Sequence, residues 1–309
     1  MKAVAITEFN AALDATEVTV PTPSDGEVLI DVEFASINGM DAMTWAGHIE
    51  GMMPYELPIT LGRDFSGTVA ALGKGVSEFE VGDEVFGLLL NMPLRDGTFA
   101  EQVSVPAWGM VKRPNGIDAQ AAGALALAGT AAKTGIDALA LSSGDTVLIC
   151  GATGGVGAIA IQLAKSAGAS VIATAATADE VAFVRDLGAD ETVDYYKDVV
   201  GEVKALHANG VDAVLHAAGD CIALADIVVS GGRFASTLGV GPEQLAGRDV
   251  QATIVMAVPN PQVLGELAAA VAEGSLKVPI SKTYGLDQIG QALKDFGSGS
   301  LGKISVAVR

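Results

Sequence analysis

The sequence predicts an α/β protein that combines a doubly wound parallel sheet with a second, mostly antiparallel β domain. A strand, a glycine-rich turn and a helix follow one another directly between residues 146 and 165. Residues 118 to 277 alternate strand-like and helix-like segments, which is typical of a parallel sheet covered by helices. Residues 1 to 116 instead alternate short strand-like runs with Gly, Pro and Asp turns, which indicates an antiparallel, barrel-like domain.

The chain is long enough for two domains, since its 309 residues exceed the usual size of one hydrophobic core. We expect one domain over residues 1–116, completed by residues 278–309, and a second over residues 117–277. The tail should contribute a helix at 286–296 and a strand at 303–308 that rejoins the first domain. The other strands expected in that domain are Lys2 to Ile6, Val28 to Phe34, Phe65 to Leu72, Glu84 to Leu88 and Ala100 to Val105.

The second domain should form its sheet from strands that are separated by helices. The expected strands are Thr146 to Cys150, Val171 to Thr174, Glu191 to Asp194, Ala213 to Ala217, Gly232 to Ser236 and Gln251 to Val258. Parallel strands of this kind are joined by crossover helices, and consecutive strands lie beside one another in most cases. The order of the segments therefore predicts a doubly wound sheet.

The glycine turn is the strongest local signal. Val147 to Ile149 reads as a buried strand, and a G-x-G-x-x-G frame falls on Ala152, Gly154 and Gly157, with an additional glycine at 155. Glycines allow a sharp bend and a close approach to a ligand, while the free N–H groups of the next helix attract an anion. A dinucleotide pyrophosphate fits this description. The alternative is a glycine turn that only lets a helix and a sheet pack.

The end of the next strand, Ser170 to Thr174, normally selects the cofactor, with an acid for the ribose of NAD or polar and basic groups for the phosphate of NADP. No acid stands there, and Thr174 and Thr177 carry hydroxyls that can donate to a phosphate. Asp179 and Glu180 follow and would repel one. We therefore expect NADP(H), with NAD(H) as the alternative. Thr177 and Glu180 also match a helix capping box, which is an equally good interpretation of Thr177.

Composition narrows the class of partners. The formal net charge is −19, which disfavours nucleic acid and anionic lipid. The longest apolar stretch is interrupted by Lys133 and Asp137, so no membrane span is expected. The N-terminal apolar run is too short for a signal peptide, and Cys150 and Cys221 fit a reducing compartment, so we expect a cytoplasmic protein. The expected partners are a small-molecule substrate and a second copy of the chain in a homodimer.

A series of motifs extends over essentially the whole chain. They are Ala35–Asp41, Leu61–Val69, Val81–Gly87, Gly97–Glu101, the glycine turn, Leu187–Asp190 with Tyr195, and Gly302 with Lys303. In this order they resemble the medium-chain dehydrogenase/reductase superfamily, in its zinc-independent quinone oxidoreductase-like branch. The resemblance implies a GroES-like catalytic domain beside a Rossmann domain, with the active site in the cleft between them.

Zinc ligands are missing from this chain. A catalytic zinc requires three converging soft or imidazole ligands. Asn38 and Gly39 stand where zinc-dependent relatives have a cysteine, and Arg63 stands in place of their histidine. Residues 88 to 108, where such relatives carry four cysteines, contain none. We therefore expect no metal site.

The resemblance implies roles for individual residues. Asn38 and Asp41 would line the nicotinamide side of the cleft, although Asn38 is interpreted almost equally well as a turn residue. Asp41, expected to be exposed and therefore ionised, is interpreted as an acceptor for backbone N–H groups rather than as a proton donor. Tyr55 is either an acid or a loop-packing residue. Thr130 would lie near the nicotinamide ribose, and residues 238 to 240 along the nicotinamide ring. The cofactor-binding residues expected are Thr130, Ala152, Thr153, Gly154, Gly155, Val156, Gly157, Thr174, Thr177, Tyr195, Ala218, Leu238, Val240, Gly302 and Lys303.

Two positions depart from relatives. Met43 replaces the lysine of some enone reductases, and Glu180 replaces the lysine of many NADP-dependent relatives. The apolar residues near Tyr55 form either a substrate pocket or a piece of core: Met40, Met43, Trp45, Met52 and Met53. Three function classes follow. The first is an NADPH-dependent reductase of quinones or α,β-unsaturated carbonyls, the second an enoyl-thioester reductase, and the third a non-enzymatic NADPH-binding protein.

Overall fold

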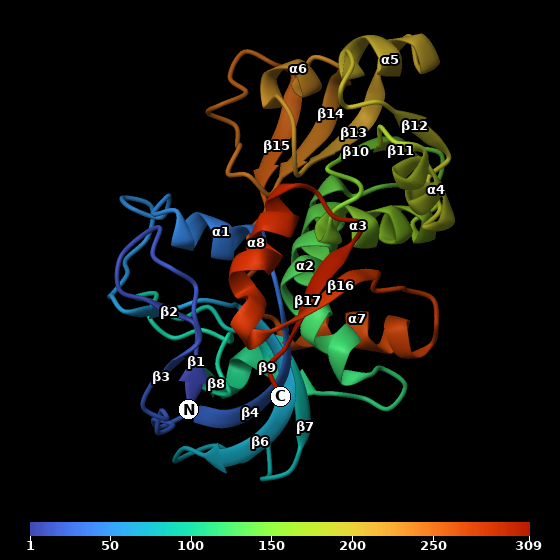
Figure 1. Cartoon of the computed structure of the whole chain (residues 1–309). Helices are drawn as coiled ribbons and strands as arrows, with labels where there is room; N and C mark the ends of the chain where they lie inside the picture. The colour runs from blue at the N-terminus through green and yellow to red at the C-terminus, as the bar shows by residue number, and fades with distance from the viewer. The chain divides into compact units, whose positions relative to one another are not determined.

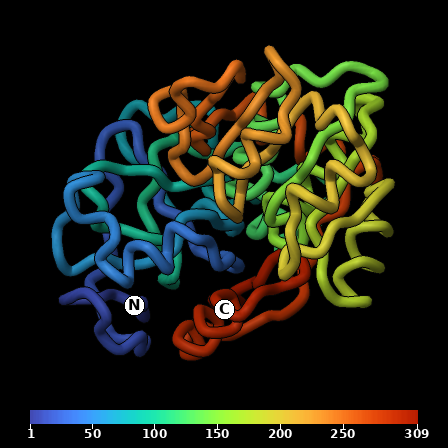
Figure 2. The backbone as a smooth tube through the Cα atoms, turned by 90° about the horizontal axis from the view of Figure 1, so that it is seen from above, coloured from blue at the N-terminus to red at the C-terminus, as the bar shows by residue number.

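The computed structural model describes residues 1–309, which separate into two compact units. Unit 1 comprises Met1–Thr130 and Val258–Arg309, and unit 2 comprises Ala131–Ala257. Both termini therefore belong to unit 1. Figure 2 marks them on the backbone trace. No helix has both the length and the apolar character needed to cross a membrane.

The unit boundaries differ from the expected 116/117 and 277/278. The first lies inside α2 (Ala119–Leu139), and the second precedes α7 (Pro261–Ala272). Helix α7 packs on strand β9 (Met110–Lys112), which belongs to unit 1. At Gly129 a Cβ would lie 3.0 Å from the Leu267 side chain, so α2 and α7 are themselves closely packed. These contacts, which no local pattern reveals, place α7 in unit 1.

Unit 2 is a doubly wound parallel sheet, as expected. Its strand order is β12-β11-β10-β13-β14-β15, and every neighbouring pair is parallel. This is the 3-2-1-4-5-6 order of the Rossmann fold. The strands are β10 (Thr146–Cys150), β11 (Ser170–Thr174), β12 (Glu191–Val193), β13 (Val211–His216), β14 (Val228–Ser236) and β15 (Val250–Ile254). Helices α3 (Gly155–Ser166), α4 (Ala178–Asp186), α5 (Val199–Leu206) and α6 (Cys221–Ala225) connect them (Figure 1).

The strand core of unit 2 explains this arrangement. Val147, Leu148 and Ile149 in β10 are fully buried, and Leu148 belongs to the same core cluster as Val214 and Phe234 of the neighbouring strands. A strand that is covered on both faces reads as a continuous apolar run rather than an alternating one. The carboxyl ends of β10, β11 and β13 lie side by side because the strands are parallel, and this edge carries the glycine turn.

Unit 1 is built mostly from antiparallel strands, also as expected. Its main sheet has the order β16-β17-β4-β6-β7-β9, with β8 paired to β4, and only β16 and β17 run parallel. The strands are β4 (Glu27–Ser36), β6 (Asp64–Leu72), β7 (Glu84–Leu88), β8 (Gln102–Pro106), β9, β16 (Ile280–Gly285) and β17 (Lys303–Ala307). Short pairs join β1 (Lys2–Ala3) to β3 (Thr16–Glu17) and β2 (Ala5–Ile6) to β5 (Ile59–Thr60). The sequence prediction missed β3, β5, β9 and β16.

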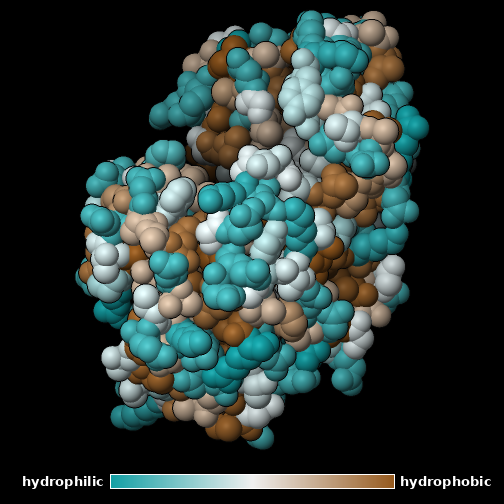
Figure 3. Space-filling model, viewed as in Figure 1, coloured by the Kyte–Doolittle hydropathy of each residue, from teal (hydrophilic) through white to brown (hydrophobic).

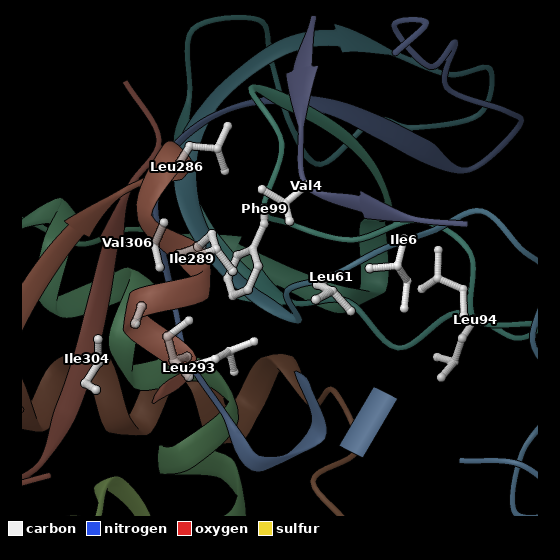
Figure 4. Packing of buried hydrophobic residues seen from close by; sticks show 14 of the residues in the cluster. Val4, Ile6, Leu61, Leu94, Phe99, Leu286, Ile289, Leu293, Ile304 and Val306 are labelled. Carbon is white, nitrogen blue, oxygen red and sulfur yellow. The ribbon is translucent and has the colours of Figure 1, made fainter. Parts of the chain in front are cut away.

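The core of unit 1 brings the two ends of the chain together. Helix α8 (Ile289–Gly297) follows a 3₁₀ turn at Leu286–Gln288, and its Ile289 and Leu293 pack with Phe99 and with Val306 of β17 (Figure 4). Helix α1 (Gly39–Trp45) starts directly after β4. The surface is mixed: on the face drawn in Figure 3, hydrophilic side chains are spread over the molecule with hydrophobic ones among them.

Candidate functional site

The glycine turn of unit 2 has the backbone geometry that its sequence predicts. Gly151 follows β10 with φ +74°, and Gly154 caps the N-terminus of α3. A Cβ on Gly157 would lie 2.3 Å from the carbonyl oxygen of Gly151 and 2.5 Å from Cα of Ala152. Only glycine permits this approach of the helix to the turn. By contrast, a Cβ on Gly154 would contact only the Gly151 oxygen, at 3.5 Å.

The turn therefore fits a pyrophosphate. Space is open beside Gly154, and the first N–H groups of α3, at Gly155, Val156 and Gly157, have no partners within the helix. An anion at this N-terminus would accept hydrogen bonds from them and would be favoured by the helix dipole. Ala152 is fully buried and supports the turn from below.

A pocket of about 510 Å³ adjoins the turn at the carboxyl ends of β10, β11 and β13. In an open parallel sheet this is the position at which ligands bind. Four of the predicted cofactor residues line it, namely Thr153, Thr174, Tyr195 and Ala218. The rest of the lining was not predicted from the sequence, and it includes Lys197, Val199, Val200, Asp220 and Leu224. A search of the segments that follow the third and fourth strands would have found them.

Thr174 at the end of β11 and Thr177 in the following loop both form hydrogen bonds with the protein's own backbone. The Thr174 hydroxyl accepts the Gly151 N–H at 3.0 Å and lies 3.4 Å from the Ile149 carbonyl oxygen, to which it donates. It thereby fastens the glycine turn to β11. Thr177 caps α4, accepting the Glu180 N–H at 3.2 Å, while the Glu180 carboxylate reaches back to the Thr177 N–H in a capping box.

A hydrogen-bond lock holds the loop after β14. His216 Nε2 lies 3.1 Å from the Gly219 carbonyl oxygen, and because a carbonyl only accepts, Nε2 carries a proton. Its Nδ1 lies 2.9 Å from the Ser236 hydroxyl, whose oxygen accepts the N–H groups of Leu238 and Val240. Leu238 is exposed and Val240 is buried. The lock positions the loop that the resemblance assigns to the nicotinamide ring.

Asn38 belongs to a buried polar cluster in unit 1. Its amide donates to the Ser36 carbonyl at 3.0 Å and to Asp64 at 3.2 Å, and its oxygen accepts the Lys303 ammonium at 2.5 Å. Lys303 also donates to the Ile37 carbonyl at 3.0 Å and lies 3.8 Å from the Asp64 carboxylate. Burial lowers the pKa of Lys303 and raises that of Asp64. Both Asn38 and Lys303 are thus engaged with the protein itself.

Asp41 is fully buried, whereas the sequence analysis treated it as exposed. Its carboxylate accepts the N–H groups of Asn38 at 2.8 Å and Gly62 at 3.0 Å. Burial raises the pKa of Asp41 to about 7, against the opposing effect of the Arg63 guanidinium. Arg63 is buried as well, and its Nε and Nη2 have no hydrogen-bond partner.

The remaining residues predicted in unit 1 lie in different settings. Tyr55 donates its hydroxyl to Glu50 at 3.1 Å and stacks edge-on against Phe9. Thr130 is buried and its hydroxyl has no hydrogen-bond partner. Gly302 has φ +83°, and a Cβ there would meet the Pro279 carbonyl oxygen at 2.4 Å. Four of the apolar residues pack against the core, Met40, Met43, Trp45 and Met53, whereas Met52 is exposed.

Comparisons with known proteins agree with this geometry. Residues 24–115 match the alcohol dehydrogenase GroES-like domain family, and residues 155–265 match the zinc-binding dehydrogenase family. A chloroplast envelope quinone oxidoreductase homolog of Arabidopsis thaliana is 36% identical over 67% of this chain and 64% of its own length. An NADPH-dependent alkenal/one oxidoreductase of the same plant is 33% identical over 72% of this chain and 58% of its own length.

The structural comparison covers the whole chain. The quinone oxidoreductase from Coxiella burnetii superposes with a TM-score of 0.91 at 30% identity, over 100% of this chain and 99% of that one. The chain spans less than two thirds of the two plant relatives, yet all of the Coxiella fold. Taken together with the glycine cradle and the two units, these matches show that the chain belongs to the medium-chain dehydrogenase/reductase superfamily, in its quinone oxidoreductase-like branch.

Proposed function

We propose that this chain is an oxidoreductase that transfers a hydride from a nicotinamide dinucleotide to a quinone or an α,β-unsaturated carbonyl compound without a metal ion. The glycine cradle with its adjoining pocket carries the proposal, because it offers helix N–H groups and open space for a pyrophosphate. When bound, a reduced nicotinamide supplies the hydride. The cradle contacts only what NADH and NADPH share, so it does not choose between them.

The residues of this chain would bind, orient and shield the reactants. We assign the pyrophosphate to the α3 N-terminus and the nicotinamide side to residues 238–240, which the His216 and Ser236 lock positions. Conjugated acceptors suit such a site, since their oxyanion is delocalised and takes its proton from water. We assign Asn38 and Asp41 to positioning, because their polar atoms are already bonded within the protein.

The residues at the positions of the zinc ligands in zinc-dependent relatives do not suit a zinc ion. Arg63 stands where zinc-dependent relatives carry a histidine, and its buried guanidinium places a positive charge at that position. No group of three or more His, Cys, Asp or Glu side chains in the structure is arranged to hold a metal. A divalent cation would meet repulsion there rather than a soft ligand.

The experiment is steady-state oxidation of NADH and of NADPH with a panel of acceptors. The panel contains a benzoquinone, a short-chain enone, an enoyl thioester and a saturated ketone, and calorimetry measures cofactor binding in parallel. Turnover of the quinone or the enone supports the proposal. Turnover of the thioester alone would favour the enoyl-thioester reductase. Binding without turnover of any acceptor would favour a non-enzymatic dinucleotide-binding protein.

We further propose a homodimer, which pairs the edge strand β15 with its copy. β15 ends the sheet of unit 2, so one side of it presents unpaired backbone groups. Ile254 on this strand and Met256 just after it are exposed. A second copy would satisfy the backbone groups and cover the apolar side chains.

A further inference from the structure

The end of β11 is the place where a doubly wound dinucleotide fold distinguishes its two cofactors. A carboxylate at this place accepts hydrogen bonds from the ribose hydroxyls of NAD, whereas NADP requires groups that receive a 2′-phosphate. The pocket reaches this place through Thr174 and Tyr195. The groups that line it therefore decide the cofactor preference.

The threonines that favoured NADP(H) in the sequence are already engaged. Thr174 both accepts and donates within the turn, and it is buried. The Thr177 hydroxyl oxygen accepts the Glu180 N–H, so the Thr177 side chain has only its one hydroxyl proton to donate to a ligand. Neither side chain supplies the set of donors that a doubly charged phosphate requires.

Glu180 occupies the same place as a fixed carboxylate. Its Oε2 accepts the N–H groups of Ala176 at 2.7 Å and Thr177 at 3.0 Å, and its Oε1 accepts the Tyr195 hydroxyl at 2.8 Å. Burial raises the pKa of Glu180, but the hydrogen bonds from Thr177, Ala176 and Tyr195 outweigh it and hold the pKa below its usual value. The group is thus ionised at neutral pH, and three donors prevent it from turning away.

The positive charge of the one lysine that lines the pocket is already paired with carboxylates. Lys197 is the lysine of the pocket lining, and its ammonium lies 3.2 Å from Asp194 and 3.8 Å from Glu202. Asp198 and Asp220 also line the pocket. A 2′-phosphate would therefore enter a region in which carboxylates outnumber ammonium groups.

We infer that Glu180, held by Tyr195 and by the N-terminus of α4, makes this chain select NADH over NADPH. The inference rests on the proposed function and reverses the sequence-based expectation of NADP(H). The shared parts of the two cofactors meet the same cradle, and only the 2′-phosphate meets the carboxylate. A neighbouring like charge is worth about tenfold in affinity at an effective dielectric between those of protein and water.

The test is calorimetric titration of NADH and NADPH into the wild type, Glu180→Gln and Asp179→Asn. Gln keeps the size and an acceptor oxygen but removes the charge. Asp179 lies in the same helical turn, is exposed and has no described role in the pocket, so Asp179→Asn removes an equal charge as a matched control. Binding is measured at low and at high salt, because screening should narrow an electrostatic preference.

We expect the wild type to bind NADH about tenfold more tightly than NADPH, with a smaller ratio at high salt. Glu180→Gln should abolish most of this ratio, chiefly by gains in NADPH affinity, and Asp179→Asn should change it less than about twofold. A wild type that binds NADPH more tightly, or a control that shifts the ratio as much as Glu180→Gln, overturns the inference and leaves the proposed function intact. Binding of neither cofactor would instead overturn the proposed function.

Discussion

At the scale of single residues, Gly154 and Gly157 have different surroundings although they are only three positions apart. A Cβ on Gly157 would press into the backbone of the turn, while a Cβ on Gly154 would make only an ordinary van der Waals contact with the Gly151 oxygen, at 3.5 Å. We therefore expect Gly157 to be required for folding and Gly154 to be required for ligand binding. Both glycines belong to the same sequence motif, so the motif alone does not distinguish these roles. Substituting each glycine separately does.

We predict that Gly154→Val folds with little change in stability but loses detectable dinucleotide binding, because its methyl groups would fill the pyrophosphate space. Gly157→Val should lower the free energy of unfolding by about 1–3 kcal/mol or more through overpacking. Urea denaturation and fluorescence titration with NADH measure the two effects. Unchanged affinity in a folded Gly154→Val protein would refute the assignment of the cradle.

Asp41 makes stability depend on pH. Its pKa is raised from 3.8 to about 7 in the folded protein. Between these values the folded state keeps a proton that the unfolded state has released, so the free energy of unfolding falls as pH rises through this window. The contribution is fully present below pH 4 and is lost above pH 7, with a slope of at most about 1.4 kcal/mol per pH unit.

The measurement compares the wild type with Asp41→Asn, since other carboxyl groups titrate equally in both. We expect the difference in free energy of unfolding, wild type minus variant, to decrease from pH 4 to pH 7. Urea denaturation at several pH values gives this difference. A difference that is constant over the window would mean that Asp41 is ionised throughout.

At the scale of elements, one buried ammonium group adds side-chain contacts to the pairing of the final strand β17 with β4. Lys303 at the start of β17 donates to the Ile37 carbonyl and to Asn38, and it neutralises Asp64 at the start of β6. A buried pair of this kind adds little net stability, but the loss of one partner leaves an uncompensated buried charge.

We predict that Lys303→Met lowers the free energy of unfolding by about 3–5 kcal/mol. The double variant Lys303→Met with Asp64→Asn should recover a large part of this loss, because it removes both charges. Chemical denaturation of the three proteins tests the coupling. If the two substitutions proved additive, the ammonium and the carboxylate would not interact energetically.

The edge strand β15 provides a second test at this scale. Ile254→Asp should shift the protein from dimer to monomer, since a charge on the edge blocks pairing with a second strand. Leu206→Asp is the matched control, because Leu206 is similarly exposed, 49% against 46% for Ile254, but lies at the end of α5. Light scattering after gel filtration reports the mass. A wild-type monomer at micromolar concentration would refute the proposed dimer.

At the scale of the whole molecule, the acidic net charge and the absence of a set of zinc ligands together determine how the protein interacts with metal ions. The net charge of −19 attracts cations loosely over the surface, but no site combines three suitable ligands. We predict that the purified protein contains no stoichiometric zinc and keeps its activity in a chelator. Elemental analysis and assays with and without chelator decide this. One zinc per chain, lost together with activity, would contradict the interpretation that Arg63 replaces a zinc ligand.

The two-unit fold followed from local patterns. The apolar run 147–149, the glycine turn and the helical spacing after it are short-range features. They predicted a doubly wound parallel sheet, which the structure confirms. The short strand-like runs between Gly, Pro and Asp turns in residues 1–116 predicted the antiparallel domain. The contact units divide the chain 14 residues after the first expected boundary (130 − 116) and 20 residues before the second (277 − 257). The second difference arises because α7 packs by long-range contacts on β9.

What the sequence determined by itself is the fold class and the glycine turn between β10 and α3, because both arise from residues that are neighbours along the chain. Tertiary structure alone decided the state of the polar groups. It buried Asp41, brought Lys303 to Asn38 across 265 positions, used Thr174 to hold the turn and fixed Glu180 beside Tyr195. Hydrogen-bond partners and desolvation depend on residues that are distant in sequence, and they set the charge that a ligand meets.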